Sequence, residues 1–181
     1  MSRKVLFVSS SLRKGSASER IAREAEKGVI ANCDDVEFVT LKDKDIRFCR
    51  GCLSCQDTGK CVIDDDARAI AEKIREADVL VFSTPIYYCG ISGQLKTLLD
   101  RCNPLYGSDY RFREVFLVTT SEDDSPDAAS GAIGSVKNWV SCFPEARFAG
   151  AFSGAGVGTE DPEDGKWADL MNDAFLFGKE I

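Results

Sequence analysis

Four cysteines lie close together in the chain, at Cys49, Cys52, Cys55 and Cys61. Their spacing, C-x2-C-x2-C-x5-C, gathers half of the eight cysteines into one short stretch. Thiolates at such spacing bind metal ions or exchange electrons as dithiols, whereas packing a core requires no such pattern. This four-cysteine segment therefore indicates a metal-ligand set, a redox-active set of thiols, or the remnant of one, and it points to electron transfer.

The charge and the missing histidine exclude several classes of function. The chain has a net charge of −7 and no histidine. An acidic chain lacks the basic face that nonspecific nucleic-acid binding requires, so we expect no nucleic-acid partner. Without histidine, a Ser-His-Asp or Cys-His mechanism and a His-ligated metal site are excluded. Any catalysis must then depend on a cofactor, carboxylates or thiols.

Length and composition predict a single globular domain. With 181 residues, 44% of them hydrophobic, the chain can bury a core of its own as one domain over residues 1–181. No apolar run approaches the roughly 20 residues that span a bilayer, and the short N-terminal run lacks the pattern of a signal peptide. We therefore expect no membrane partner and a cytoplasmic location, where clustered cysteines serve metal or redox chemistry.

Strand-like and helix-like segments alternate along the chain. Apolar runs predict strands over residues 4–9, 36–41, 79–83, 115–119 and 146–152. Apolar residues at helical spacing predict helices over residues 18–30, 65–77, 92–102, 126–142 and 162–177. This alternation predicts an α/β domain, with helices on both faces of a five-stranded parallel sheet. The four-cysteine segment falls in a loop insertion, residues 44–64, after the second strand.

The loop after the first predicted strand, residues 9–20, has the composition of a phosphate-binding loop. In parallel sheets, ligands bind beyond the carboxyl ends of the strands, where the strand order reverses. Hydroxyl groups, backbone N–H groups at a helix start and one arginine all favour an anion there. The loop has neither dinucleotide nor P-loop glycine spacing, so a phosphate monoester such as that of FMN fits best. The candidate residues are Ser10, Ser11, Arg13, Ser16, Ala17 and Ser18. The alternative is a polar turn in which Ser16 or Ser18 caps the helix.

The loops after the third and fourth predicted strands lie at the same end of the sheet. The first is apolar and aromatic, as the ring of a flavin requires, and its candidate residues are Pro85, Ile86, Tyr87, Tyr88, Cys89 and Gly90. The second is small and acidic and could line the other side of the ring through Thr119, Thr120 and Ser121. The alternatives are a tyrosine that packs the core and a loop that caps the next helix.

The chain resembles the flavodoxin-like NADPH-dependent FMN reductase superfamily, and within it the iron-sulfur flavoproteins. The strongest match is C-x-G-C-x-x-C-x-x-x-G-x-C, followed by the acidic pair Asp64 and Asp65. Two further motifs match in order, [ST]-P-x-Y at residues 84–87 and G-Q-L-K-x-L-x-D-R at residues 93–101. The resemblance extends from Lys4 to about Arg101, and the last third of the chain matches only in general shape.

The phosphate loop matches the family in part. Ser11, Arg13 and Lys14 agree with the pattern G-S-P-R-K-x-G-x-T. Ser10 replaces the glycine and Leu12 the proline. The resemblance implies a flavodoxin-like three-layer sandwich, noncovalent FMN, and assembly as a homodimer or homotetramer.

The resemblance also implies that Cys49, Cys52, Cys55 and Cys61 hold a [4Fe-4S] cluster. Three alternatives remain open. Zinc accepts four thiolates, although its ligands usually form two short pairs across a longer span. Cys52 and Cys55 form a C-x-x-C of the dithiol kind. The segment could also bind no metal.

The predicted function is an FMN-dependent oxidoreductase that passes electrons from NAD(P)H or a reduced partner, through FMN and any cluster, to a quinone, flavin or oxygen. Hydride transfer to a flavin requires no protein acid or base, which agrees with the missing histidine. The alternatives are a non-catalytic electron carrier, whose acidic surface steers a protein partner, and a cofactor-free thiol switch. Of the other cysteines, Cys33, Cys102 and Cys142 are predicted to be buried.

Overall fold

The computed structural model describes residues 2–32, 34–158 and 165–181. The strands are β1 (Lys4–Ser9), β2 (Asp35–Thr40), β3 (Val79–Tyr87), β4 (Gly90–Ile91), β5 (Glu114–Ser121) and β6 (Arg147–Ala155). The helices are α1 (Ala17–Ile30), α2 (Ser54–Thr58), α3 (Asp66–Glu76), α4 (Gly93–Arg101), the 3₁₀ turn η1 (Asn103–Leu105), α5 (Ser130–Val140) and α6 (Lys166–Glu180).

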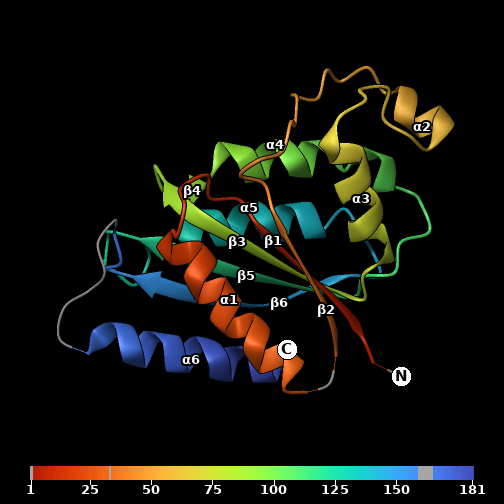
Figure 1. Cartoon of the computed structure of the whole chain (residues 1–181). Helices are drawn as coiled ribbons and strands as arrows, with labels where there is room; N and C mark the ends of the chain where they lie inside the picture. Colours follow the sequence, from red (N-terminus) through yellow and green to blue (C-terminus); the bar gives the residue numbers. More distant parts are fainter. Residues whose placement is uncertain (1, 33, 159–164) are drawn as a thin grey trace.

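Five parallel strands form one sheet in the order β2-β1-β3-β5-β6, which confirms the predicted architecture (Figure 1). The short strand β4 was not predicted and pairs antiparallel with the end of β3. The chain leaves β1 for the outer strand β2 and returns on the other side of β1 as β3. The strand order therefore reverses between β1 and β3, the position where doubly wound sheets bind ligands.

The central strands are apolar on both sides because helices cover both faces of the sheet. Residues 5–8 of β1 are fully buried. On one face, β1 and β3 pack with α3, α4 and α5 in a core that includes Ile74, Leu98 and Val136. On the other face they pack with α1 and α6 through side chains such as Ile21 and Ala174. The result is the predicted three-layer sandwich (Figure 1).

Two glycines allow α1 and α6 to pack closely. A Cβ atom on Gly28 would lie 2.2 Å from the carbonyl oxygen of Phe175. A Cβ atom on Gly178 would lie 1.9 Å from the carbonyl oxygen of Ala25. Neither helix could approach the other as closely with a larger residue at these positions.

The insertion at residues 44–64 projects from the sandwich near the start of α3 (Figure 1). It is mostly irregular and exposed, and it contains the short helix α2. The following helix is capped by Asp65, whose Oδ1 accepts a hydrogen bond of 3.1 Å from the Ala67 N–H. The third strand extends four residues beyond its predicted end at residue 83, because β3 continues through Pro85, opposite Thr120, to Tyr87.

The last two predicted helices differ at their ends. The helix predicted over residues 126–142 spans Ser130–Val140, because residues 125–129 form turns closed by backbone hydrogen bonds. The final helix begins at Lys166 and ends at Glu180, three residues beyond its predicted end. Its predicted start at Pro162 lies outside the described residues, as does Cys33. Among the residues described, no helix is both long and apolar enough to cross a membrane.

Candidate functional site

A cavity of about 560 Å³ lies at the carboxyl ends of β3 and β5. The structure brings the three predicted loops together here, as the strand order requires. Of the candidate residues, those that line the cavity are Arg13, Pro85, Ile86, Tyr87, Tyr88, Cys89, Thr120 and Ser121. Glu122, Asp123, Ala128, Val157 and Gly158 complete the lining and were not predicted. A volume of this size is ordinary for a small-molecule or cofactor site.

The aromatic side of this cavity is a two-residue hairpin between β3 and β4. Tyr88 and Cys89 occupy the turn with φ of 47° and 62°, a left-handed conformation that glycine or asparagine adopts more easily. The backbone of the turn packs on α5, where a Cβ atom on Gly131 would lie 2.1 Å from the Cys89 carbonyl oxygen. Tyr88 is fully exposed and Tyr87 is half exposed. The hairpin therefore holds apolar rings at the cavity mouth.

Several predicted phosphate-loop hydroxyls hold the loop itself. Ser10 Oγ donates to the Ser83 carbonyl oxygen at 2.9 Å, and Ser92 Oγ donates to Ser10 Oγ at 2.9 Å. Ser16 caps α1, because its Oγ accepts a hydrogen bond from the Glu19 N–H at 3.3 Å. The helix cap that the sequence offered as the alternative to phosphate binding is therefore present at Ser16.

The remaining candidates contribute no lining in the part of the chain described. Ser11, Ala17, Ser18 and Thr119 are buried, and Gly90 is half-buried in β4. Sequence reasoning missed Ser92, which caps α4 and whose N–H donates to Thr84 Oγ1 at 2.9 Å. Ser92 directly precedes the family motif at residues 93–101, and this position could have indicated its role as the helix cap.

The four-cysteine segment lines a second cavity, of about 450 Å³, against the carboxyl ends of α4 and α5. All four of its thiols contribute to this mostly apolar lining, together with Arg101, Asn103, Trp139 and Cys142. The described cysteines are free thiols. Among the described residues, no three cysteines or carboxylates form a preassembled metal site. The structure therefore brings the predicted ligands to one cavity without closing them around one point.

Of the other cysteines that the structure describes, one is a buried thiol and two are exposed. Cys102 is buried as predicted, and desolvation raises the pKa of its thiol to about 12. The prediction that Cys142 is buried was wrong: Cys142 follows the end of α5, is exposed and lines the cysteine cavity. Cys89 is exposed in the hairpin turn.

Two cysteines of the four-cysteine segment receive hydrogen bonds. Asn103 Nδ2 donates to Cys55 Sγ at 3.0 Å. Hydrogen bonds from the backbone and side chain of Ser54 lower the pKa of the exposed Cys52 thiol. Because thiolates are the metal ligands and the nucleophiles, the contacts of Cys52 prepare this residue for ligation or redox chemistry.

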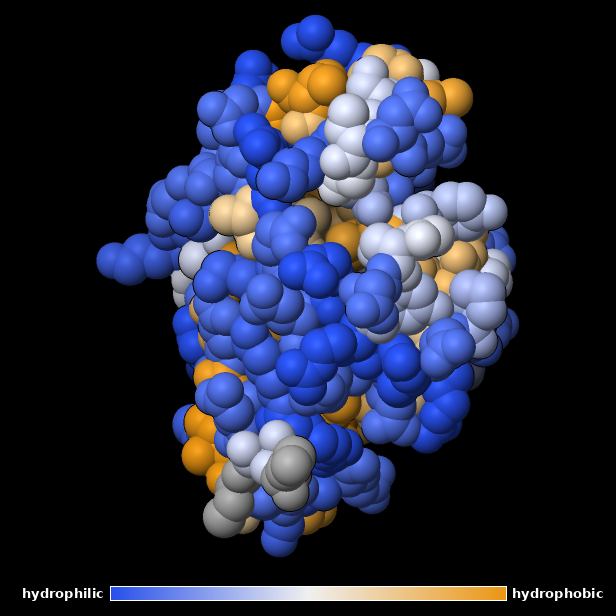
Figure 2. Space-filling view, turned by 90° about the vertical axis from the view of Figure 1, so that its right-hand side faces the viewer, coloured by the Kyte–Doolittle hydropathy of each residue, from blue (hydrophilic) through white to orange (hydrophobic). Residues whose placement is uncertain are grey.

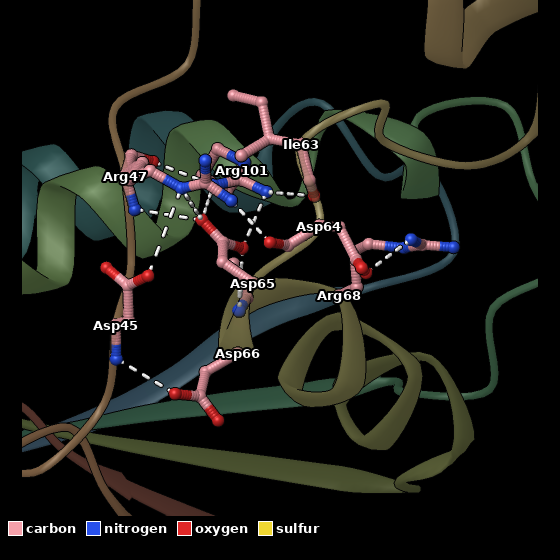
Figure 3. Close-up of polar contacts among 9 residues, drawn as sticks. Asp45, Arg47, Ile63, Asp64, Asp65, Asp66, Arg68 and Arg101 are labelled. Carbon is pink, nitrogen blue, oxygen red and sulfur yellow. Dashed lines mark hydrogen bonds and ion pairs between the residues drawn. The ribbon is translucent and has the colours of Figure 1, made fainter.

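A buried ion pair lies at the base of the segment (Figure 3). The side chains of Arg101, at the end of α4, and Asp65, the cap of α3, are both fully buried. Arg101 Nη1 and Nη2 donate to the two carboxylate oxygens of Asp65 at 2.6 and 2.9 Å. The same nitrogens donate to the Arg47 carbonyl oxygen at 2.7 Å and the Ile63 carbonyl oxygen at 3.1 Å. Arg101 thus joins the two ends of the four-cysteine segment.

The environment of Asp65 favours its charged form. Burial alone would raise the pKa of this carboxyl, but hydrogen bonds from Arg101, the Arg47 N–H and the Ala67 N–H outweigh burial and lower it. Arg101 responds in the opposite direction, because its contacts with Asp65 and Cys61 outweigh desolvation and raise its pKa. The pair therefore stays ionised at neutral pH.

The donor chemistry of the cysteine cavity fits a thiolate-ligated metal centre. Four thiols meet a mostly apolar lining, and a buried cation lies beside them. Arg101 Nε is buried and has no hydrogen-bond partner among the described residues. An anionic cluster held by four thiolates would place negative charge near this unpartnered N–H group.

Comparison with known proteins agrees with this geometry. The model of the family described as NADPH-dependent FMN reductase matches residues 3–142. An iron-sulfur flavoprotein of Methanocaldococcus jannaschii is 39% identical over 102 residues, covering 56% of this chain and 53% of that protein. The chain spans about half the length of the curated relatives it matches.

Solved structures share the whole fold. An NAD(P)H:quinone oxidoreductase from Methanothermobacter marburgensis aligns with a TM-score of 0.71 at 15% identity, covering 99% of this chain and 97% of that one. An FMN-dependent NADH-azoreductase from Bacillus anthracis, in complex with FMN, aligns with a TM-score of 0.69 at 14% identity, covering 98% and 96%. From the family match, which covers more than half of the chain, the chain belongs to the NADPH-dependent FMN reductase family.

Proposed function

We propose that this protein is an FMN-dependent oxidoreductase that transfers electrons from NAD(P)H or a reduced redox partner to a quinone, flavin or oxygen. The observation that carries the proposal is the meeting of three loops in one cavity at the reversal of strand order. The family match and the FMN complex of the azoreductase-like neighbour support FMN as the cofactor. Bound FMN supplies hydride acceptance and one-electron release.

The chain's own residues would bind and orient this cofactor. Arg13, exposed at the cavity, is the residue proposed to bond the phosphate. Pro85, Ile86 and Tyr87 would pack against the ring, and Thr120 and Ser121 would line its other side. The serine hydrogen bonds that join Ser10, Ser83 and Ser92 hold the first two loops at a fixed spacing.

We propose that Cys49, Cys52, Cys55 and Cys61 hold a [4Fe-4S] cluster, which supplies one-electron transfer when bound. The shared cavity, the free thiols and the iron-sulfur flavoproteins among the relatives support this assignment. Because the thiols do not yet converge, cluster binding would order the segment, as metal binding commonly does. Homodimer or homotetramer assembly and a cytoplasmic location remain predictions of the sequence.

An absorption spectrum of protein purified without oxygen, with iron and acid-labile sulfide assayed on the same sample, tests both cofactors. We expect flavin absorption peaks, a broad shoulder at roughly 400 nm from thiolate-ligated iron, and about four irons per chain. Flavin without iron, after reconstitution with iron and sulfide, would reject the cluster and retain the reductase. Colourless protein that takes up no added FMN would reject both.

A non-catalytic electron carrier is the second candidate, favoured by the surface around the four-cysteine segment. Figure 2 shows hydrophobic surface at the upper end of the molecule, the end that carries this segment. Leu53, Val62 and Tyr106, which line the cysteine cavity, and Phe48, which precedes Cys49, are more than half exposed, as in a docking surface for a redox protein. Steady-state NAD(P)H oxidation with added quinone or flavin separates the two candidates. Turnover would identify an enzyme. A protein that does not oxidise NAD(P)H but is reduced by ferredoxin would be a carrier.

A further inference from the structure

Helix α4 connects the two candidate sites directly. Its cap, Ser92, is hydrogen-bonded to Ser10 of the loop after β1 and to Thr84 of β3. Its last residue, Arg101, and the following Asn103 contact the four-cysteine segment. Nine helical residues, about 14 Å at 1.5 Å per residue, separate these two sets of contacts.

The contacts of Arg101 fix where the segment begins and ends. Its guanidinium donates to the carbonyl oxygen of Arg47, two residues before Cys49, and to that of Ile63, two residues after Cys61. The side chain is fully buried, so these bonds are made away from competing water. Asp65 balances the charge of Arg101. One residue of α4 thus holds both ends of the segment in fixed positions (Figure 3).

The second contact reaches a thiol itself. Asn103 Nδ2 donates to Cys55 Sγ at 3.0 Å, and Asn103 also lines the cysteine cavity. An N–H group that bonds to a ligating sulfur withdraws charge from it. This effect stabilises the reduced, more negative state of a thiolate-bound cluster and raises its reduction potential.

We propose that Arg101 and Asn103 are positioning residues for the cysteine site: Arg101 holds the two ends of the four-cysteine segment, and the Asn103 amide raises the reduction potential of the centre bound there. The role of Asn103 rests on the proposed cluster, whereas the role of Arg101 depends only on contacts within this chain. The two roles separate because Arg101 contacts the backbone of the segment, whereas Asn103 contacts a sulfur.

Asn103→Ala tests the sulfur contact, with Asn32→Ala as the matched control. The side chain of Asn32 donates to the Lys179 carbonyl oxygen at 2.9 Å, at the far ends of α1 and α6. In cluster-containing protein, Asn103→Ala should lower the cluster midpoint potential and leave that of FMN unchanged. Iron should also be lost to a chelator faster than from wild type, because removing a partner of a metal ligand typically lowers metal affinity or activity about 10–100-fold. Unchanged potential and unchanged iron retention would overturn the role of Asn103.

Arg101→Lys and Arg101→Gln test the backbone contacts, with Arg111→Gln as the control. Arg111 makes an exposed ion pair with Asp78, remote from the cysteines in the chain. In iron-free protein, both Arg101 variants should expose residues 44–64 to limited proteolysis at least tenfold faster than wild type, while the control is cleaved at the wild-type rate. Circular dichroism confirms that the variants are folded; if one is not, Arg101→Gln is combined with Asp65→Asn to remove both charges.

The outcomes separate this inference from the proposed function. Wild-type protein that binds no iron after reconstitution rejects the cluster and, with it, the role of Asn103. The proteolysis of iron-free protein still decides the role of Arg101. Cleavage of the Arg101 variants at the wild-type rate would overturn that role even if the cluster is present.

Discussion

Arg13 is the residue on which the phosphate assignment depends. Its backbone N–H bonds to Ser11 Oγ at 3.4 Å, and its side chain lines the cavity. Arg13→Ala should weaken FMN binding by about 1.5–3 kcal/mol, the range for a charged hydrogen bond. Fluorescence titration of FMN-free protein measures this loss. Arg147→Ala, at the amino end of β6, is the control and should bind FMN normally; unchanged affinity in Arg13→Ala would remove Arg13 from the site.

Asp65 should make the free energy of unfolding depend on pH in the acidic range. Its pKa is lowered in the folded chain from an ordinary value of 3.8, so its contribution is fully present above that value and is lost as pH falls below it. The free energy of unfolding should therefore decrease below about pH 4. Asp65→Asn should cost about 3–5 kcal/mol at pH 7, because Arg101 then lacks its partner.

Denaturant unfolding of both proteins at several pH values checks this expectation. The variant should show a smaller loss between pH 5 and pH 3 than wild type. Equal pH dependence in the two proteins would mean that Asp65 is not the group that titrates.

At the scale of elements, the β3–β4 hairpin depends on its contact with α5. Gly131→Ala would place a methyl group against the Cys89 carbonyl oxygen, so the hairpin must shift. FMN affinity should fall, by about tenfold if the displacement costs ~1.4 kcal/mol, within the range for overpacking. Gly134→Ala is the matched control: it lies on the same helix, nothing lies within 4 Å of its added methyl group, and it should bind FMN normally. Equal FMN affinity in the two variants would show that the hairpin position does not matter.

The elements themselves were largely predictable, and the contacts between them were not. Continuous apolar runs such as residues 5–8 gave the buried strands, because only a strand covered on both faces has that composition. The extension of β3 through Pro85 depends on pairing with Thr120 of β5, a partner 35 positions away. The contacts of Arg101 with Arg47 and Ile63 likewise join distant positions, although Arg101 lies in a motif that the sequence had marked.

For the whole molecule, the docking of α6 on α1 closes one face of the sandwich. Gly178→Ala would force a methyl group into the backbone of α1 and should destabilise the protein by about 1–3 kcal/mol. The free energy of unfolding in urea measures the effect. Gly134→Ala again serves as control and should be neutral or more stable by about 0.4–1 kcal/mol. A Gly178→Ala protein of wild-type stability would mean that the helices separate at little cost.

The organisation of the sites in the whole molecule was predictable in part. The rule for parallel sheets placed three loops at one cavity, and the structure has that arrangement. The rule concerns only strand ends, so it gave no position for the insertion at residues 44–64. That position follows from a buried ion pair and from Asn103, neither of which has a periodic signal in the sequence.

Tyr88 stands in a left-handed turn with its whole side chain in water. The backbone conformation costs roughly 1–2 kcal/mol for a residue with a Cβ atom, and the exposed ring recovers none of it. An aromatic side chain that becomes covered buries about 150–250 Å², worth ~25 cal/mol for each Å² of apolar surface. A molecule that covers Tyr88 would therefore gain up to several kcal/mol from that one side chain, which offsets part of the entropy lost on association. Tyr88 therefore provides an exposed apolar contact for a binding molecule at the mouth of the cavity.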